Sequence, residues 1–382
     1  MTLRSAARSR GVFVNPALTE PFGLTLLEAA ASGLPLLATH DGGPRDILRN
    51  CRNGRLIDPL DVRAMGRALA GMLAEPGNWD RWARNGIAGV DRHYSWKAHV
   101  QKYLKLLDRL EGGRLARRQL HFGRSRMPTI GRMIVCALDN TLLGDDAGLA
   151  AFRALLESHR DRDRIGFGIA TGRSLADALR LIERHRLPHP DLLITSVGAE
   201  IHYGHKMVQD QAWARHIDYR WDLKALRAAL RGLPGLKLQP KQEQHPFKLS
   251  YFIDPAKAPP VRRLVRHLRE RDLHANVVFS RHMFLDLLPV RASKGLALRH
   301  VLGRWGILPD AVLVAGSCGS DEELLSGNTL GVVVGNYSAE IERLRGKPRI
   351  HFARGEHAAG IIEGMEHYDF LGSIRVPGEE AE

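Results

Sequence analysis

The sequence has little cysteine and no long apolar run, and each shortage narrows the possible classes of protein. Cys51, Cys136 and Cys318 are the three cysteines among 382 residues, and they lie far apart. Their spacing matches no metal-binding motif, and so few thiols predict reduced cysteines in a cytoplasmic protein. No apolar stretch approaches the roughly 20 residues that a membrane helix needs. Residues 1–8 also lack the apolar segment of a signal peptide. We therefore expect a cytoplasmic protein with no membrane partner.

Aromatic residues and negative charge are also scarce. Aromatic residues make up 6% of the chain, and 56 Lys and Arg face 42 Asp and Glu, for a formal net charge of +14. Such a balance can indicate a nucleic-acid partner. Here, however, the arginines are spread along the chain without aromatic residues between them to stack on bases. We therefore expect no nucleic-acid partner.

The length and local composition predict more than one domain. One hydrophobic core seldom holds more than about 250–300 residues, and this chain is longer. Short apolar strands alternate with helices in the first region, which is typical of a parallel α/β sheet. A glycine pair, clustered arginines and no apolar period follow, which indicates a linker. The predicted divisions are a first domain at 1–111, a basic linker at 112–130, a second core at 131–200 and 289–382, and a cap at 201–288.

Apolar runs predict the individual strands. Those expected in the first region are 11–16, 35–39 and 54–59, and those in the second core are 133–139, 165–170, 191–196, 311–316 and 331–334. In the cap we expect two long strands at 245–253 and 275–289, with helices near 221–233 and 259–272.

Two glutamates eight positions apart mark the first region. Glu20 precedes a predicted helix and Glu28 lies within it. Acidic residues near a helix start interact favourably with the helix dipole, so the two glutamates could have no further role. The run resembles the Glu-x₇-Glu signature of retaining GT-B glycosyltransferases. The resemblance implies that Glu20 and the amides of Phe22, Gly23 and Leu24 face a donor sugar and that Glu28 holds the ribose of UDP.

The first region covers only part of such a transferase. The resemblance implies that the chain begins inside the second Rossmann domain of the GT-B pattern, without the upstream acceptor domain. A truncated gene, a frameshifted gene or a misplaced start codon would each explain this. UDP-glucose is therefore expected as a ligand of an intact parent protein.

The second region carries a motif with a missing acid. Residues 134–143 resemble the Asp-x-Asp-x-Thr motif of haloacid-dehalogenase (HAD) phosphatases. In that family the first Asp attacks phosphorus and the second acts as acid and base. Ala137 stands at the first position, whereas Asp139 and Thr141 keep the others. The resemblance makes Asp139 a vestigial acid/base, because a methyl group cannot attack phosphate or bind Mg²⁺.

Two further motifs resemble the phosphate-holding groups of the same family. Thr171 ends a predicted strand before a Gly-Arg-Ser run, and Lys294 begins a predicted helix after the cap. A threonine there could instead cap a helix, and a lysine at a helix start is common. The resemblance assigns both residues to phosphate binding.

The fourth motif, within residues 314–323, has lost one of its acids. Ser317 replaces the first acid and Asp321 keeps the second. Mg²⁺ prefers carboxylate oxygens in near-octahedral geometry, so a site left with Asp139 and Asp321 should bind Mg²⁺ weakly or not at all. No organic cofactor is expected. An engineered substitution is one explanation for Ala137, and natural decay, which the change at Ser317 favours, is the other.

The cap and the remaining segments of the chain, which include residues 194–201 and 247–251, resemble sucrose-6-phosphate phosphatases. The order of transferase end, basic linker and phosphatase-like domain resembles sucrose-phosphate synthases, which make sucrose 6-phosphate from UDP-glucose and fructose 6-phosphate. The resemblance implies sucrose biosynthesis, sucrose 6-phosphate as ligand, and Lys248 and Tyr251 as sugar-binding residues.

The predicted fold class is α/β. A partial GT-B Rossmann-like domain is followed by a HAD-like Rossmannoid domain with an inserted α+β cap of the C2 type. For its function, a non-catalytic module that recognises sucrose 6-phosphate is the leading hypothesis. An active sugar phosphatase and a docking module for a separate sucrose phosphatase are the alternatives.

Overall fold

The computed structural model describes residues 10–111, 130–160 and 164–377. They divide between two compact units, Met1–His121 and Phe122–Glu382. Most of the predicted linker, residues 112–129, lies outside the described residues. Among the described residues, no helix combines the length and the apolar character needed to span a bilayer.

The first unit contains a parallel sheet, as predicted, and its strands lie in the order β1-β2-β3. The strands are β1 (Phe13–Asn15), β2 (Leu36–Thr39) and β3 (Gly54–Ile57). The helices are α2 (Leu24–Ala31), α3 (Gly43–Cys51), α4 (Val62–Ala74), α5 (Pro76–Tyr94) and α6 (Trp96–Glu111). Each parallel strand pair requires a crossover, and α2 and α3 supply them. Leu26, Ala30 and Leu36 meet in the buried core of this unit.

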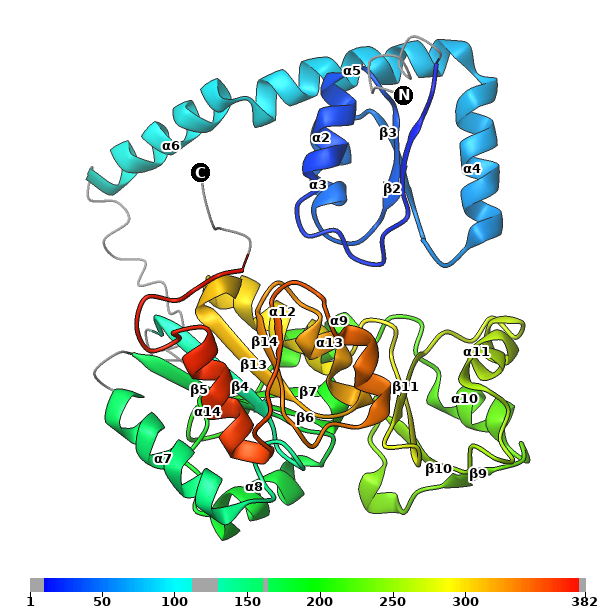
Figure 1. The fold of residues 1–382 in the computed structure, drawn as a ribbon. Helices are drawn as coiled ribbons and strands as arrows, with labels where there is room; N and C mark the ends of the chain where they lie inside the picture. Colours follow the sequence, from blue (N-terminus) through cyan, green and yellow to red (C-terminus); the bar gives the residue numbers. More distant parts are fainter. Residues whose placement is uncertain (1–9, 112–129, 161–163, 378–382) are drawn as a thin grey trace. The chain divides into compact units, whose positions relative to one another are not determined.

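The second unit is built on a sheet in the order β15-β14-β13-β4-β5-β6-β7-β8 (Figure 1). All neighbouring pairs from β15 to β6 are parallel, whereas β7 and β8 are antiparallel additions. Their bounds are β4 (Arg132–Ala137), β5 (Ile165–Ala170), β6 (Leu192–Thr195), β7 (Glu200–Tyr203), β8 (Val208–Gln209), β13 (Val312–Gly316), β14 (Leu330–Val333) and β15 (Ile350–Phe352).

Helices cover both faces of this sheet. Its helices are α7 (Asp146–Arg160), α8 (Leu175–Arg184), α9 (Gln211–Ile217), α12 (Lys294–Trp305), α13 (Glu322–Leu325) and α14 (His357–His367). Short 3₁₀ helices of this unit lie at Ser196–Gly198, Lys241–Glu243, Pro309–Ala311, Gly319–Asp321 and Ala339–Leu344. Burial on both faces explains why the strands read as continuous apolar runs.

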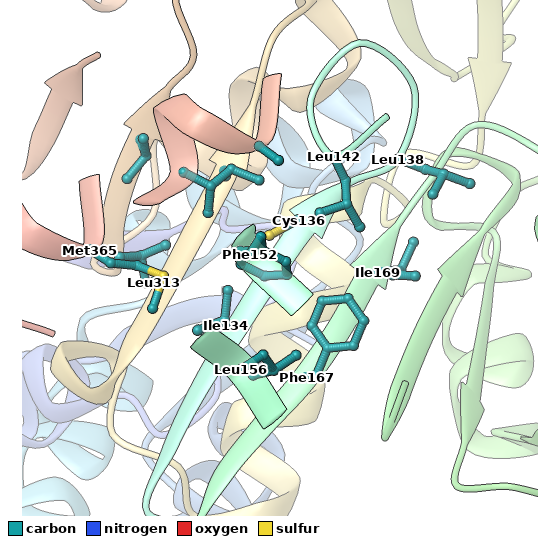
Figure 2. Packing of buried hydrophobic residues seen from close by; sticks show 14 of the residues in the cluster. Ile134, Cys136, Leu138, Leu142, Phe152, Leu156, Phe167, Ile169, Leu313 and Met365 are labelled. Atoms are coloured by element: carbon teal, nitrogen blue, oxygen red, sulfur yellow. The ribbon is translucent and has the colours of Figure 1, made fainter. Parts of the chain in front are cut away.

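Strand β4 shows how the two faces are filled. Ile134 and Cys136 pack with Phe152 of α7 and Phe167 of β5, as Figure 2 shows. The alternate residues of β4, among them Val135, belong to the core on the opposite face, with α9 and α12. Successive side chains of a strand point to opposite faces, so β4 is held from both sides and its carboxyl end is fixed.

The cap is a four-stranded antiparallel sheet in the order β11-β12-β10-β9, with two helices. Its elements are α10 (Leu223–Leu230), β9 (Leu236–Leu238), β10 (Leu249–Ile253), α11 (Val261–Arg269), β11 (Asn276–Ser280) and β12 (Phe284–Leu288). The single long strand predicted at 275–289 is wrong. It is a hairpin, because Arg281 and His282 take left-handed conformations with φ of 52° and 54° and reverse the chain.

The predicted start of the cap at residue 201 is also wrong. Strands β7 and β8 extend the core sheet, and α9 packs on it through Trp213 and Ile217. The core therefore continues through α9. The change in sequence texture at residue 201 marks the switch from parallel to antiparallel pairing within one sheet.

Gly198 allows a close approach that the site needs, and its replacement tests the fold. It has φ of 97°, and a Cβ there would lie 2.2 Å from the carbonyl carbon of Ser293. Gly198→Ala should lower the free energy of unfolding by about 2–5 kcal/mol, from the left-handed conformation plus the clash. Gly232→Ala is the matched control, since φ is 77° and nothing lies within 4 Å. It should cost only about 1–2 kcal/mol. Urea denaturation measures both, and equal losses would contradict the close approach.

Candidate functional site

A cavity of about 340 Å³ lies at the carboxyl ends of the central core strands, with the cap contributing part of its wall. Ala137 lines it from the end of β4, and Thr171 lines it from the end of β5. Lys294, at the start of α12, lines it too, and Lys248 does so from the cap. Residues from the first, second and third sequence motifs thus line one space.

The end of β4 lacks a carboxylate and is closed by hydroxyl groups. Ala137 is buried, with 2% of its surface exposed. Nearby, the Thr141 hydroxyl donates to Ser317 Oγ at 2.9 Å, and both residues are buried. This contact joins the ends of β4 and β13. Ser317, which stands where the family motif has an acid, therefore satisfies a neighbouring hydroxyl and carries no charge.

Asp139 is engaged through both its carboxylate and its carbonyl. Arg173 Nε donates to both carboxylate oxygens at 2.9 Å, and Arg173 Nη2 donates to Oδ1 at 2.7 Å. Arg281 Nη2, from the tip of the cap hairpin, donates to the Asp139 carbonyl at 3.0 Å. A carboxylate held by a guanidinium fork is strongly paired. The predicted vestigial acid/base is therefore not free to accept a proton from a substrate in this arrangement.

A buried ion pair forms the floor of the cavity. Lys294 Nζ lies 2.7 Å from Asp321 Oδ1, and both side chains are almost wholly buried. Asp321 Oδ2 also accepts from the amides of Ser317 at 3.0 Å and Cys318 at 3.1 Å. Lys294 donates to Ser320 Oγ at 3.1 Å.

The pair controls the ionisation of its members. Burial alone would lower the pKa of Lys294, but Asp321, together with Cys318 and Asp139, offsets this and holds that pKa above its usual value. Burial would likewise raise the pKa of Asp321, and Lys294 with the two amides keeps that pKa below its usual value. Burial, reinforced by Asp321, raises the pKa of the neighbouring Cys318 thiol, while Lys294 and Arg281 oppose the rise.

The position of Lys294 is not what helix stability alone would select. Ser293 caps α12 by accepting from the Leu296 amide, and Lys294 is the first residue of the helix. A cation there faces the positive end of the helix dipole. Asp321 compensates for this placement, so a lysine at this point serves the cavity.

Thr171 lies where the motif predicted it, at the end of β5. It is 1% exposed, and its hydroxyl accepts from the Arg173 amide at 3.2 Å. Lys248 reaches from the cap to the same loop and donates to the Gly172 carbonyl at 3.1 Å. The cap is thereby hydrogen-bonded to the turn that carries Thr171.

The predicted role of Tyr251 in sugar binding does not fit its position. Its side chain is 5% exposed and packs among the apolar residues beneath α10 and α11. Phe252, the next residue of β10, lines the cavity instead. Successive strand residues face opposite sides of the sheet, so Lys248, Ser250 and Phe252 share the face toward the cavity and Tyr251 does not.

Two arginines of the site were missed as functional residues. Arg173 was visible within the Gly-Arg-Ser run, next to a motif residue. Arg281 gave no such signal, because it lies in a segment predicted to be the interior of a strand. Its position depends on a hairpin turn that the apolar pattern did not reveal.

The residues at the end of β4 do not fit a divalent metal. Phosphatases with this fold generally use Mg²⁺, and Mg²⁺ requires several oxygen ligands in near-octahedral geometry. The two predicted ligands, Asp139 and Asp321, are each paired with a cation. Across residues 10–111, 130–160 and 164–377, no group of three or more His, Cys, Asp or Glu side chains could hold a metal ion.

In the first unit, the predicted donor-sugar residues lie together at the start of α2. Asn15 Nδ2 and the Phe22 amide each donate to a carboxylate oxygen of Glu20, both at 3.4 Å. Gly23 is the N-cap of α2, with φ of 92°. Leu24 begins the helix and Glu28 is one turn further, so both exposed side chains share one helix face.

The core sheet with its motif-bearing strand ends and the inserted α+β cap define a HAD-type phosphatase fold. Residues 130–369 match the Sucrose-6F-phosphate phosphohydrolase family, and the chain belongs to this family. Residues 2–88 match the family Glycosyl transferases group 1. The predicted order of a glycosyltransferase segment and a HAD-like unit is confirmed.

Relatives cover different parts of the chain. A probable sucrose-phosphate synthase 1 of Oryza sativa subsp. indica is 26% identical over 94% of this chain. The chain spans 44% of the length of that relative. A probable sucrose-phosphatase 2 of Arabidopsis thaliana is 34% identical over 62% of this chain and 59% of its own length.

One solved structure matches the second unit closely. It is the sucrose-phosphatase from Synechocystis sp. PCC6803 in complex with sucrose and phosphate. It is 33% identical, with a TM-score of 0.60, and the match covers 64% of this chain and 100% of that chain. The similarity therefore includes the cap as well as the core.

Removing one member of the buried pair should destabilise the second unit. Asp321→Asn leaves Lys294 buried without a compensating charge and should lower the free energy of unfolding by about 3–5 kcal/mol. Urea denaturation at neutral pH measures the loss. Asp254→Asn, at an exposed pair with Lys257, is the control and should change stability far less.

The pH dependence of the same variant gives a second readout. Because the pKa of Asp321 lies below its usual 3.8, its contribution is present above that pH and is lost as the pH falls toward the lower folded-state value. The difference between the original chain and Asp321→Asn should therefore shrink on acidification. A difference that stays constant from pH 7 to pH 3 would contradict this assignment.

Proposed function

We propose that this chain is the C-terminal part of a protein of the sucrose-phosphate synthase type and that its second unit binds sucrose 6-phosphate without hydrolysing it. The observation that carries the proposal is the state of the cavity. Thr171, Lys248 and Lys294 line it, whereas a methyl group stands at position 137. Such a site can hold a phosphate and has no group to attack it.

Both the geometry of the cavity and the types of its residues disfavour hydrolysis. Ala137 provides no nucleophile, and the Asp139 carboxylate is held by the Arg173 guanidinium. A general acid or base must reach the reacting atom with a group that can exchange a proton. Loss of a nucleophile alone typically costs factors on the order of 10⁴ to 10⁶ in rate. The paired second acid adds to this loss.

The groups that remain in the cavity favour binding of a phosphate ester. A phosphate dianion next to Ala137 avoids the repulsion that a nearby carboxylate would exert. The related sucrose-phosphatase was solved with sucrose and phosphate, and the match covers its whole length. In this chain, Phe252 and Phe284 of the cap supply apolar wall, and Gln239 and Glu243 supply polar groups for sugar hydroxyls. Sucrose 6-phosphate fits this combination of anion and sugar.

The first unit supports the wider assignment to sucrose biosynthesis. Its match to glycosyl transferases and the similarity to a sucrose-phosphate synthase over 94% of this chain favour a protein that uses UDP-glucose and fructose 6-phosphate. Glu20, Glu28 and the amides at the start of α2 are then the donor-binding groups. The three free, isolated cysteines suit a cytoplasmic protein.

The chain should release no phosphate from sucrose 6-phosphate when Mg²⁺ is supplied, because neither a nucleophile nor a free pair of acids is present. A colorimetric phosphate assay against a buffer control is the measurement. Installing Ala137→Asp together with Ser317→Asp should restore detectable release, and either change alone should restore less. Release by the original chain, clearly above the control, would establish an active phosphatase.

Calorimetry should show that the chain binds sucrose 6-phosphate more tightly than sucrose, with affinity of about micromolar to millimolar. Thr171→Val keeps the size of the side chain and removes the hydroxyl, so it should weaken binding of the phosphate ester about tenfold. Binding of sucrose itself should not change in this variant. Equal or undetectable binding of the two ligands would leave docking to a partner as the function of the second unit.

A further inference from the structure

Arg281 places a cap guanidinium inside the core site. It lies directly after β11, at the tip of the hairpin that joins β11 to β12, and it lines the cavity together with Ala137. Its Nη2 donates to the Asp139 carbonyl at 3.0 Å, across 142 positions of sequence. The charge therefore stands beside the end of β4, where the family motif has its first acid and this chain has none.

The core, and not the hairpin alone, fixes this position. Consecutive non-glycine residues with positive φ are uncommon, and here Arg281 and His282 are held so by contacts from the core. The Arg281 amide donates to the Glu340 carboxylate, and His282 Nε2 lies 3.7 Å from the same carboxylate. Gly319 allows the hairpin to approach, because a Cβ there would lie 2.1 Å from the Phe279 carbonyl oxygen. The guanidinium is thus placed before any ligand arrives.

The charges around the cavity leave Arg281 available. Two of the cations are committed, since Arg173 pairs with Asp139 and Lys294 pairs with Asp321. Within the part of the chain that the structure describes, Arg281 forms no ion pair with a carboxylate side chain. Its one contact in the cavity is with a carbonyl, which leaves other N–H groups of the guanidinium free to donate.

Two carboxylates also line the cavity, and they belong to the cap. Asp286 accepts from Ser250 Oγ at 2.5 Å, and Glu243 lines the cavity wall. By contrast, the lysines and arginines of the cavity are hydrogen-bonded to groups at the core strand ends and in the loops that follow them. Arg281 and Arg173 both bond to Asp139. Lys248 bonds to Gly172, and Lys294 bonds to Asp321. On the core side, the carboxylates of Asp139 and Asp321 are each paired with a cation, which leaves the charges of Arg281 and Lys248 in excess, and the other two carboxylates belong to the cap.

We propose that Arg281 supplies from the cap the positive charge that a divalent cation supplies in phosphatases of this fold, so that the cavity binds a phosphate monoester without metal. This rests on the proposed binding of a sugar phosphate. A guanidinium presents planar, paired donors that match phosphate oxygens. It also disfavours a metal here, since it occupies the Asp139 carbonyl oxygen and repels a second cation nearby.

The test is calorimetry on the full chain with sucrose 6-phosphate, once in EDTA and once in excess Mg²⁺. The dissociation constants should agree within about twofold. In Arg281→Gln, which keeps a donor for the Asp139 carbonyl and removes the charge, binding should weaken about 10- to 100-fold. Arg281→Lys should give an intermediate loss, because the charge remains without the planar fork. Arg263→Gln, at an exposed site of α11, is the matched control and should bind as the original chain does.

The outcomes separate this inference from the function on which it rests. Sucrose binding and the thermal midpoint should not change in Arg281→Gln, and their loss together would show that Arg281 only holds the cap in place and would overturn the proposal. Binding of sucrose 6-phosphate that disappears in EDTA, or that is unchanged in Arg281→Gln, would also overturn it while leaving the proposed ligand intact. No binding by the original chain under either condition would refute the proposed ligand itself.

Discussion

The buried ion pair between Lys294 and Asp321 is the interaction on which the cavity of the second unit depends. Burial penalises each charge, and a lysine at the first position of α12 also faces the positive end of the helix dipole. Each charge is tolerable only because the other lies 2.7 Å away. Asp321 in turn orders the turn after β13 by accepting from two amides. The pair thus joins α12 to the end of β13, and neither residue can change alone without cost.

The same balance explains how this site keeps its shape with Ala137 and Ser317 at two of the motif positions. Each remaining acid of the phosphatase motifs is paired with a cation, and the two positions without acids are filled by a methyl group and by a hydroxyl that accepts from Thr141. A buried site stays folded when its charges are compensated and its polar groups are bonded. A reacting site needs groups left poised for the substrate instead. This arrangement supports the proposed binding of a ligand without hydrolysis.

The contacts between the cap and the core include hydrogen bonds to two backbone carbonyls of the core. Lys248 donates to Gly172, and Arg281 donates to Asp139, so both cap residues bond to backbone groups in the loops that follow the core strands. Backbone carbonyls at these positions are available whatever side chain the motif carries. A cap that bonds to them stays in register over the cavity even where the motif residue at position 137 has changed. The position of the cap therefore does not depend on the side chain at position 137.

Local pattern and residue identity determined much of this protein from the sequence alone. Continuous apolar runs predicted the central strands, including 165–170 with its observed bounds, because both faces of the sheet are buried. Motif order predicted the two units, and the residue at position 137 excluded a nucleophile. Only the tertiary structure decided that Asp139 pairs with Arg173 and that Arg281 enters the cavity. It alone also decided that Tyr251 faces away from the cavity and that the core continues through α9. Those features depend on contacts between distant segments, as in the 142-residue separation of Arg281 and Asp139. A shift of one residue along a strand, or one hairpin turn, changes which side chain faces the cavity. Neither can be predicted from composition or motif spacing.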